Sequence, residues 1–172
     1  MTRRTIACIG ECMVEMCKKS DVQYEMAFAG DTANTAIYLS RLLNSSHSSV
    51  DYVTALGNDP YSTQIYNFLN SENVCTTQIR RLDGEMPGIY FIETDNEGER
   101  SFYYYRSAAA AKKMFEGDRG EILLSNLSNY EWLYLSGISL SILDTNSLSK
   151  LIMALKKARD KGTKIVFDGN FR

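Results

Sequence analysis

The segment from residue 132 to residue 168 constrains the fold more than any other part of this 172-residue chain. Residues 132–136 and 164–168 are short apolar runs typical of strands. Between them, Asp144 is placed to cap a helix and Gly162 to end it. A strand, a helix and a second strand form a βαβ unit, which requires a parallel sheet with a right-handed crossover. The apolar face of this helix comprises Leu148, Leu151, Ile152, Leu155 and Ala158.

The amino-terminal part repeats this rhythm. Residues 5–9 are continuously apolar and are followed by Gly10, which indicates a strand buried on both faces. Helical spacing of apolar residues begins after Gly30, with Asp31 or Thr32 as the predicted N-cap. A strand at 50–56 and a helix at about 61–69 follow. The predicted fold class is α/β.

One segment departs from the α/β pattern. Residues 87–94 and 101–106 are rich in aromatic and β-branched residues, and Gly98 lies in the loop between them, as a three-residue hairpin turn requires. Centring the turn on residue 97 pairs Tyr90 with Tyr104 and places Arg106 on the same face. The sequence thus predicts an antiparallel hairpin with an aromatic face, which suits a lid or an interface.

The composition excludes several classes of protein. There are 19 Lys+Arg and 21 Asp+Glu residues, a net charge of −2 without long runs of one sign, so we expect no nucleic-acid partner. No apolar stretch approaches the length of a bilayer span, and no signal-peptide core precedes the first strand, so we expect no membrane partner and a cytoplasmic location. The four cysteines are expected to be buried free thiols, and His47 to be a solvated loop residue.

Ligands of an open parallel sheet bind beyond the carboxyl ends of its strands. This chain places small, polar or charged residues there: Gly10 and Glu11 with Glu15 nearby, 57–59, 136–137, and 168–172. The last group combines Asp168, Asn170 and Arg172 just past a strand predicted to be buried. Asp168 is either a functional acid or the cap of a turn.

Two further sets of residues are candidates for ligand contact. Gly30 opens a helix whose free N–H groups and dipole favour an anion or a sugar oxygen, and Asn34 follows one turn later among alanines. Tyr104 and Arg106 carry a phenol and a forked cation suited to hydroxyls and a carboxylate, or they are ordinary residues of an exposed strand. The common phosphate loop, dinucleotide fingerprint, nucleophile elbow and metal clusters are missing from the sequence.

Six motifs, in this order, resemble the amino-terminal part of the ribokinase (PfkB) family of carbohydrate kinases. The tyrosine-rich strand that ends in Arg and the Gly-Asp-Thr opening are closest to the sugar-acid kinases of that family. The likeness runs essentially end to end. The motifs are GECMVE at 10–15, GDTANTA at 30–36, YVTALG at 52–57, ERSFYYYR at 99–106, LYLSGISL at 133–140 and FDGNFR at 167–172.

The resemblance implies a ribokinase-like parallel sheet flanked by helices, with an inserted small antiparallel β lid formed by segments near 12–29 and 77–106. It implies ATP-dependent, Mg²⁺-dependent phosphorylation of a sugar acid, 2-keto-3-deoxygluconate above others, and a homodimer through the lid. The sugar-acid contacts implied are Glu15, Gly30, Asp31, Thr32, Asn34, Tyr90, Tyr104, Arg106 and Arg172, with Asp168 and Asn170 near the phosphate or metal.

The sequence departs from the family pattern in two places. Ala29 stands where many relatives have a second glycine. The Gly-Ala-Gly-Asp motif, which supplies the family's catalytic base and anion hole, is missing from the 172 residues, so we expect a truncated chain that carries the substrate-binding half without the nucleotide-binding half and is inactive alone. A kinase for another sugar, a non-catalytic sugar-acid-binding or dimerisation module, and a plain α/β interaction protein remain as alternatives.

Overall fold

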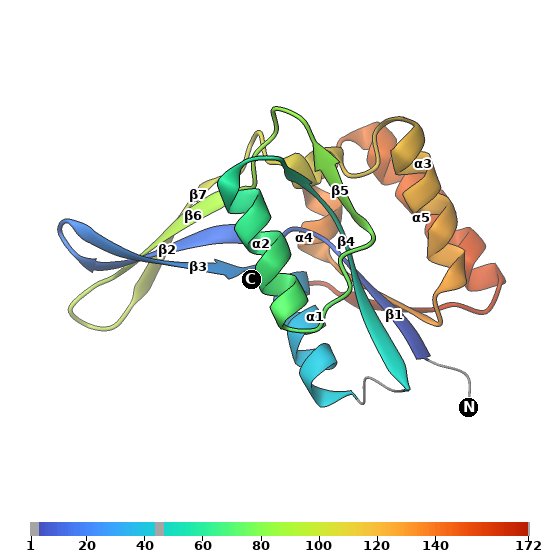
Figure 1. Ribbon diagram of the computed structural model, residues 1–172, viewed down its shortest axis with the longest axis horizontal. Helices are drawn as coiled ribbons and strands as arrows, with labels where there is room; N and C mark the ends of the chain where they lie inside the picture. Colours follow the sequence, from blue (N-terminus) through green and yellow to red (C-terminus); the bar gives the residue numbers. More distant parts are fainter. Residues whose placement is uncertain (1–3, 44–46, 172) are drawn as a thin grey trace.

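The computed structural model describes residues 4–43 and 47–171 and contains two sheets (Figure 1). Five parallel strands form the core sheet, in the order β5-β4-β1-β8-β9. These strands are β1 (Arg4–Ile9), β4 (Ser48–Gly57), β5 (Ile79–Leu82), β8 (Trp132–Ser136) and β9 (Lys164–Asp168). Four strands form a second sheet, which we call the lid sheet, in the order β3-β2-β6-β7. They are β2 (Met13–Ser20), β3 (Gln23–Ala29), β6 (Ile89–Thr94) and β7 (Arg100–Tyr105).

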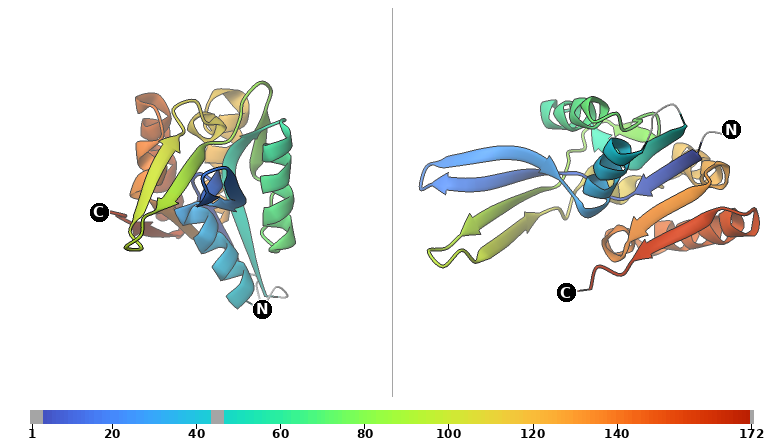
Figure 2. Two further views of the ribbon diagram at one scale, coloured as in Figure 1. Left: turned by 90° about the vertical axis from the view of Figure 1, so that its left-hand side faces the viewer. Right: turned by 90° about the horizontal axis from the view of Figure 1, so that it is seen from below.

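Helices cover both faces of the core sheet (Figures 1 and 2). Successive residues of β1 point to opposite faces: Ile6 and Cys8 pack with residues of α1 and α2, and Ala7 and Ile9 pack with residues of α3 and α5. Because both faces are covered, the continuous apolar run of β1 is buried as predicted. The helices are α1 (Asp31–Leu42), α2 (Pro60–Ser71), α3 (Gly117–Asn126) and α5 (Thr145–Asp160), with shorter turns at η1 (Ala110–Lys113), η2 (Leu127–Asn129) and α4 (Gly137–Ser141).

The predicted βαβ unit is confirmed. The Asp144 carboxylate accepts hydrogen bonds from the backbone N–H groups of Asn146 and Ser147, at 2.8 and 3.0 Å. Gly162 ends the helix with φ +100°, and β8 pairs with β9 in parallel. The carboxyl ends of β1, β4 and β8 therefore meet at the edge of the core sheet where a ligand site is expected.

The lid sheet is formed by two separate segments of the chain. The β2–β3 hairpin lies between β1 and α1, and the β6–β7 hairpin lies between β5 and η1. Both are antiparallel, and a parallel pairing of β2 with β6 joins them into one sheet that projects from one end of the core (Figures 1 and 2). The range 77–106 expected for the second lid segment also includes β5, which pairs with β4 in the core sheet, so the lid strands of that segment begin only at Ile89.

The register of the second hairpin is confirmed. Tyr90 pairs with Tyr104 and Ile92 with Phe102, and Gly98 lies at the turn with φ +88°. The Asp95 backbone N–H donates to the Glu99 carbonyl at 3.0 Å, which closes the three-residue loop. The aromatic face therefore lies where the alternation of side chains placed it.

Three local predictions were wrong. The N-cap of α1 is Gly30, because Asp31 is already helical and its carboxylate accepts from the adjacent Thr32 N–H at 2.7 Å. Strand β9 is mostly exposed, because it is the edge strand of the core sheet. All four cysteines are free, but only Cys8 and Cys12 are buried, since Cys17 and Cys75 lie in partly exposed positions on the lid and near the sheet end.

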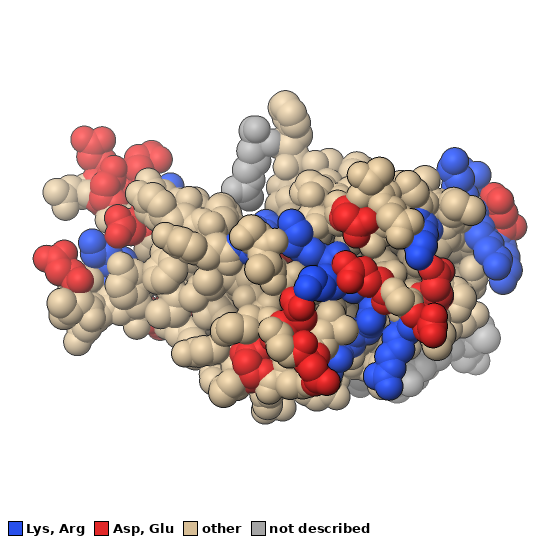
Figure 3. Space-filling view, turned by 90° about the horizontal axis from the view of Figure 1, so that it is seen from above, with Lys and Arg blue, Asp and Glu red and all other residues tan. Residues whose placement is uncertain are grey.

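Charged side chains of both signs alternate over the core, and the lid face seen from above is mostly uncharged except near its far end (Figure 3). Across residues 4–43 and 47–171, none of the helices has the length and apolar character needed to cross a membrane.

Candidate sugar-binding site

A hollow of about 440 Å³ lies between the lid sheet and the carboxyl ends of the core strands. It brings together seven of the residues predicted from the sequence, and they come from α1, the lid and the segment after β9. Its lining residues are Met13, Gly30, Asp31, Asn34, Tyr90, Phe102, Tyr104, Arg106, Ile138 and Asn170. The site is therefore assembled from segments that are distant in sequence.

The floor of the hollow is the first turn of α1. A Cβ atom on Gly30 would lie 2.2 Å from the Glu11 carbonyl oxygen, so only glycine lets the helix start this close to the end of β1. Asn34 is exposed one turn later, on the side that lines the hollow. This places a carboxylate, an amide and the first N–H groups of a 12-residue helix around one volume, which suits a polyhydroxylated ligand.

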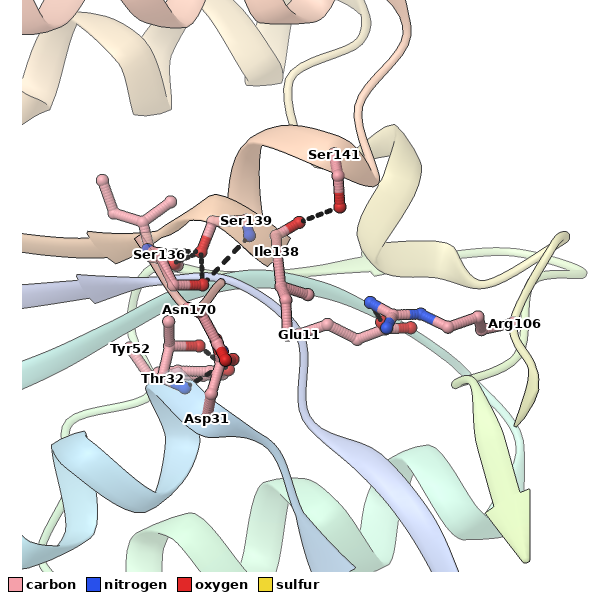
Figure 4. Close-up of polar contacts among 11 residues, drawn as sticks. Glu11, Asp31, Thr32, Tyr52, Arg106, Ser136, Ile138, Ser139, Ser141 and Asn170 are labelled. Carbon is pink, nitrogen blue, oxygen red and sulfur yellow. Dashed lines mark hydrogen bonds and ion pairs between the residues drawn. The ribbon is translucent and has the colours of Figure 1, made fainter. Parts of the chain in front are cut away.

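The segment after β9 contributes Asn170 to the lining of the hollow, where its side chain meets that of Asp31 (Figure 4). The Asn170 side-chain amide donates to the Asp31 carboxylate at 2.9 Å, and the Asn170 backbone N–H donates to the Asp168 carboxylate at 2.9 Å. Asn170 has φ +44°, a conformation that asparagine tolerates better than most residues. Asp168 thus caps a turn, which was one of the two roles predicted for it. Asn170 lines the hollow.

The roof is the aromatic face of the lid. Tyr90 stacks on Tyr104 with ring centroids 5.5 Å apart, and Phe102 stacks on Tyr104 at 6.4 Å. The Tyr90 hydroxyl donates a hydrogen bond to the Glu15 carboxylate, and burial together with this bond raises the pKa of Tyr90 well above its ordinary value. Glu15 is therefore held by Tyr90 instead of lining the hollow itself.

Arg106 forms an ion pair with Glu11 at the junction of the lid and the core (Figure 4). Glu11 is almost completely buried, and desolvation raises the pKa of its carboxyl although Arg106 opposes this shift. The guanidinium also lies over the Tyr104 ring, with its carbon atom 5.9 Å from the ring centroid. Within residues 4–43 and 47–171, no group of three or more His, Cys, Asp or Glu side chains is arranged to hold a metal ion.

The pfkB family carbohydrate kinase model matches residues 3–172. The chain belongs to the PfkB family of carbohydrate kinases. This confirms the resemblance drawn from the six sequence motifs, and the two-sheet architecture agrees with it.

Curated members of the PfkB family include close relatives of this chain. The 2-dehydro-3-deoxygluconokinase of Escherichia coli strain K12 is 44% identical over 169 residues, which cover 98% of this chain and 54% of the relative. The protein of the same name from Dickeya dadantii is 44% identical over 172 residues, with 100% and 55% covered. The chain spans about half the length of these curated relatives.

A solved structure shows the same fold. The crystal structure of 2-dehydro-3-deoxygluconokinase from Thermotoga maritima superimposes with a TM-score of 0.82 at 24% identity, over 99% of this chain and 52% of that one. Fructokinase from Xylella fastidiosa gives a TM-score of 0.76 at 25% identity, over 98% and 51%. The PfkB architecture is thus common to kinases named for different sugars.

The structure differs from the predicted set of contacts at some positions. Thr32 is fully buried, and its hydroxyl lies 3.0 Å from that of Tyr52, so the helix start packs on β4 through this residue and its side chain has no surface toward the hollow. Arg172 lies outside the described residues. Sequence reasoning missed Met13, Phe102 and Ile138, because apolar lining residues have no chemical signature in a sequence. It also missed the pairing of Glu11 with Arg106, which depends on packing between distant segments.

Proposed function

We propose that this chain is the sugar-acid-binding portion of a kinase that phosphorylates 2-keto-3-deoxygluconate, also called 2-dehydro-3-deoxygluconate, to its 6-phosphate in the cytoplasm. The main support is the position of Arg106, a cation at the wall of a hollow lined by hydroxyl-binding groups. The names of the relatives at 44% identity agree with this substrate. Fructokinases are more distant, at 28% identity for the protein from Vibrio alginolyticus.

Each polar residue of the hollow has a role in this proposal. Arg106 binds the substrate carboxylate with two parallel hydrogen bonds, a geometry that lysine cannot reproduce. Asp31, Asn34 and the Gly30 backbone bind sugar oxygens from the floor. Tyr104 and Tyr90 cover the substrate from the lid, and Glu15 acts through Tyr90. Arg172 is assigned to the substrate or the transferred phosphate by resemblance alone.

ATP and Mg²⁺ belong to the family's reaction in general, and among residues 4–43 and 47–171 no cluster of acidic, His or Cys side chains is arranged to hold a metal ion. Asp168 is engaged by the turn at Asn170, and the hollow is lined by too few acidic side chains to hold a metal ion. We therefore assign the nucleotide, the metal and the catalytic base to portions of the longer relatives that this chain does not span.

The lid sheet is the proposed homodimer contact. Phe102, Tyr103, Tyr104 and Tyr105 are all substantially exposed on β7, and Val22, Tyr24 and Met26 are exposed at the other edge of the same sheet. Exposed aromatic and apolar groups of this density are typical of protein interfaces.

The substitution Arg106→Lys in the full-length protein tests the proposal. This substitution keeps the positive charge but removes the planar guanidinium that can form two parallel hydrogen bonds with a carboxylate. We therefore expect the KM for the sugar acid to rise by about 10- to 100-fold, which corresponds to a loss of about 1.5–3 kcal/mol of binding free energy. The KM for ATP should hardly change. Arg41→Lys is the matched control, because Arg41 forms a two-pronged ion pair with Glu72 on the surface, away from the hollow. Weaker binding of both substrates, or of neither, would place Arg106 in a lid contact only.

Assays on the 172-residue chain separate catalysis from binding. A chain verified by mass to end at Arg172 is expected to show no ATP-dependent phosphorylation, because the expected base is outside its sequence. Magnesium-dependent turnover by this chain would contradict the expectation. Sugar-acid binding without turnover by the full-length protein would favour the alternative of a non-catalytic binding module.

A further inference from the structure

The ion pair of the buried Glu11 with the partly exposed Arg106 has a use beyond joining the lid to the core. We propose that Glu11 is a positioning residue, which holds the Arg106 guanidinium at the wall of the hollow so that its free edge faces the carboxylate of the substrate. The inference rests on the proposed function, because it assigns Glu11 to sugar-acid recognition through Arg106.

The pair lies where the chain passes between the two sheets. Glu11 follows the end of β1 and leads into β2, and Arg106 follows the end of β7 and leads back to the core. Gly88 leaves the space that the pair fills, because a Cβ atom there would lie 2.6 Å from a Glu11 carboxylate oxygen and 3.1 Å from the Arg106 Cβ. The Gly88 carbonyl in turn accepts from the Val14 N–H at 2.9 Å, which fixes this slot to β2.

Burial gives Glu11 one main partner. Its side chain is 2% exposed, compared with 23% for Arg106, and no described residue donates a hydrogen bond of good geometry to either carboxylate oxygen. Lys112 attracts the Glu11 carboxylate from farther away, and Asp31 repels it. Arg106 is therefore the cation that compensates the buried negative charge of Glu11, and the attraction between the two holds the guanidinium close to Glu11.

Without the ion pair to Glu11, the Arg106 side chain could extend into either of two hollows that it lines. It lines the 440 Å³ hollow and also a second hollow of about 680 Å³, which Lys112 and Ser141 line as well. A free arginine side chain samples many rotamers, and ordering it costs conformational entropy when a ligand binds. The ion pair with Glu11 and the contact with the Tyr104 ring hold the guanidinium in place before the substrate arrives.

The chemistry allows one guanidinium to serve two carboxylates. Arginine has five N–H donors, and the ion pair with Glu11 is made through Nη2. The remaining N–H groups stay available for the carboxylate of the sugar acid. A lysine at position 106 would pair with Glu11 through its single ammonium group, and it would have no second set of N–H groups arranged to bind the carboxylate of the substrate.

The test is Glu11→Gln in the full-length protein, which keeps the size of the side chain and removes its charge. We expect the KM for 2-keto-3-deoxygluconate to rise about tenfold or more, as the loss of a charge-assisted contact implies, with little change in kcat or in the KM for ATP. In the double variant with Arg106→Lys the two effects should not add, because Glu11 acts through Arg106. Glu72→Gln is the matched control, since it removes a carboxylate from an arginine pair on the surface.

A second readout does not depend on activity. NMR of the arginine side-chain N–H groups in the ligand-free protein should show a restrained Arg106 guanidinium in the wild type and a mobile one in Glu11→Gln. If Glu11→Gln does not fold, Glu11→Asp, which keeps the charge but withdraws it by one methylene, should raise the same KM by a smaller factor. Unchanged binding of the acid by a folded Glu11 variant, or additive effects with Arg106→Lys, would overturn the positioning role alone. A wild type that binds no sugar acid would overturn the proposed function, and the positioning role with it.

Discussion

The core sheet and the lid sheet are stabilised by different interactions. In the core, β1, β4 and β8 are covered by helices on both faces, and residues such as Leu133 and Tyr52 are completely buried. In the lid, all six residues of β7 are exposed, although three of them are tyrosines. The lid is held by strand pairing and by aromatic stacking across strands.

This difference separates the stability of the molecule from its recognition surface. Apolar burial between helices stabilises the core, where side chains such as Leu133 and Tyr52 have no surface left for a ligand. The aromatic side chains of the lid keep much of their surface in solvent, so covering that surface by a substrate or a second subunit can contribute to binding. The ligand hollow lies between the two sheets and takes residues from both.

The largest expected effect that tests this difference between the core and the lid comes from a pair of side-chain substitutions to alanine in the full-length protein. Leu133→Ala in β8 removes a side chain that has no exposed surface, so we expect the free energy of unfolding to fall by about 2–5 kcal/mol. Phe102→Ala in β7 removes a side chain that is 42% exposed, and we expect a loss of about 1 kcal/mol, mainly its aromatic contacts. Urea denaturation followed by circular dichroism measures both. Equal losses would mean that the lid face is covered in the folded assembly and that the contrast does not hold.

A smaller effect is expected at the tip of the lid. Gly98→Ala forces a side chain into φ +88° with no neighbouring atoms in the way, so the cost is conformational and should be about 1 kcal/mol. Hydrogen exchange should show faster amide exchange in β6 and β7 and unchanged protection in the core strands. Gly98→Asn should cost less, because asparagine enters this region more readily. Uniformly faster exchange in both sheets would show that the lid and the core open together.

The smallest effect is a pH dependence at the junction of the two sheets. Burial raises the pKa of Glu11 above its ordinary 4.5, so the folded protein binds a proton more tightly there than the unfolded chain. The contribution of Glu11 to stability is therefore greatest below pH 4.5 and falls as the pH rises through the raised pKa. The free energy of unfolding of the wild type, minus that of Glu11→Gln, should decrease as the pH increases.

Glu72 provides the control of opposite sign. Its hydrogen bonds from Arg41 lower its pKa, so its stabilising contribution is present above the ordinary value and is lost as the pH falls. The same difference measured with Glu72→Gln should thus increase with pH. A slope of the same sign for both variants would contradict the assignment for Glu11.

The sequence was sufficient wherever the interactions are local. The cap at Asp144, the stop at Gly162 and the Tyr90–Tyr104 register all depend on a few neighbouring residues, and all are confirmed. The PfkB family was also recognisable, because its six motifs include residues that line the hollow, such as Gly30, Asn34 and Arg106. Six of the predicted sugar-acid contacts line one hollow, together with Asn170, which was predicted to lie near the phosphate or metal.

The remaining features depend on contacts between distant segments. The first hairpin was expected only from the family resemblance, because β2 and β3 alternate irregularly and β2 is completed by a parallel pairing with β6. The exposure of β9 follows from its place at the sheet edge, which its apolar sequence does not reveal. Thr32 was predicted to contact the ligand, but in the structure its hydroxyl interacts with that of Tyr52 on β4.

The parallel pairing of β2 with β6 also has a consequence for the order of folding. Glu15 and Tyr90, which pair across these strands, are 75 residues apart in the chain, whereas each lid hairpin closes over a short turn. Closing a long loop costs more entropy than closing a short one, so we expect the two hairpins to form early and to join only after β1, α1 and β4 have brought their bases together. Pulse-labelling hydrogen exchange during refolding would show this as protection of the β6–β7 pairing before that of β2–β6. The 440 Å³ hollow, whose roof is the joined sheet, would then be the last of the features described to take shape.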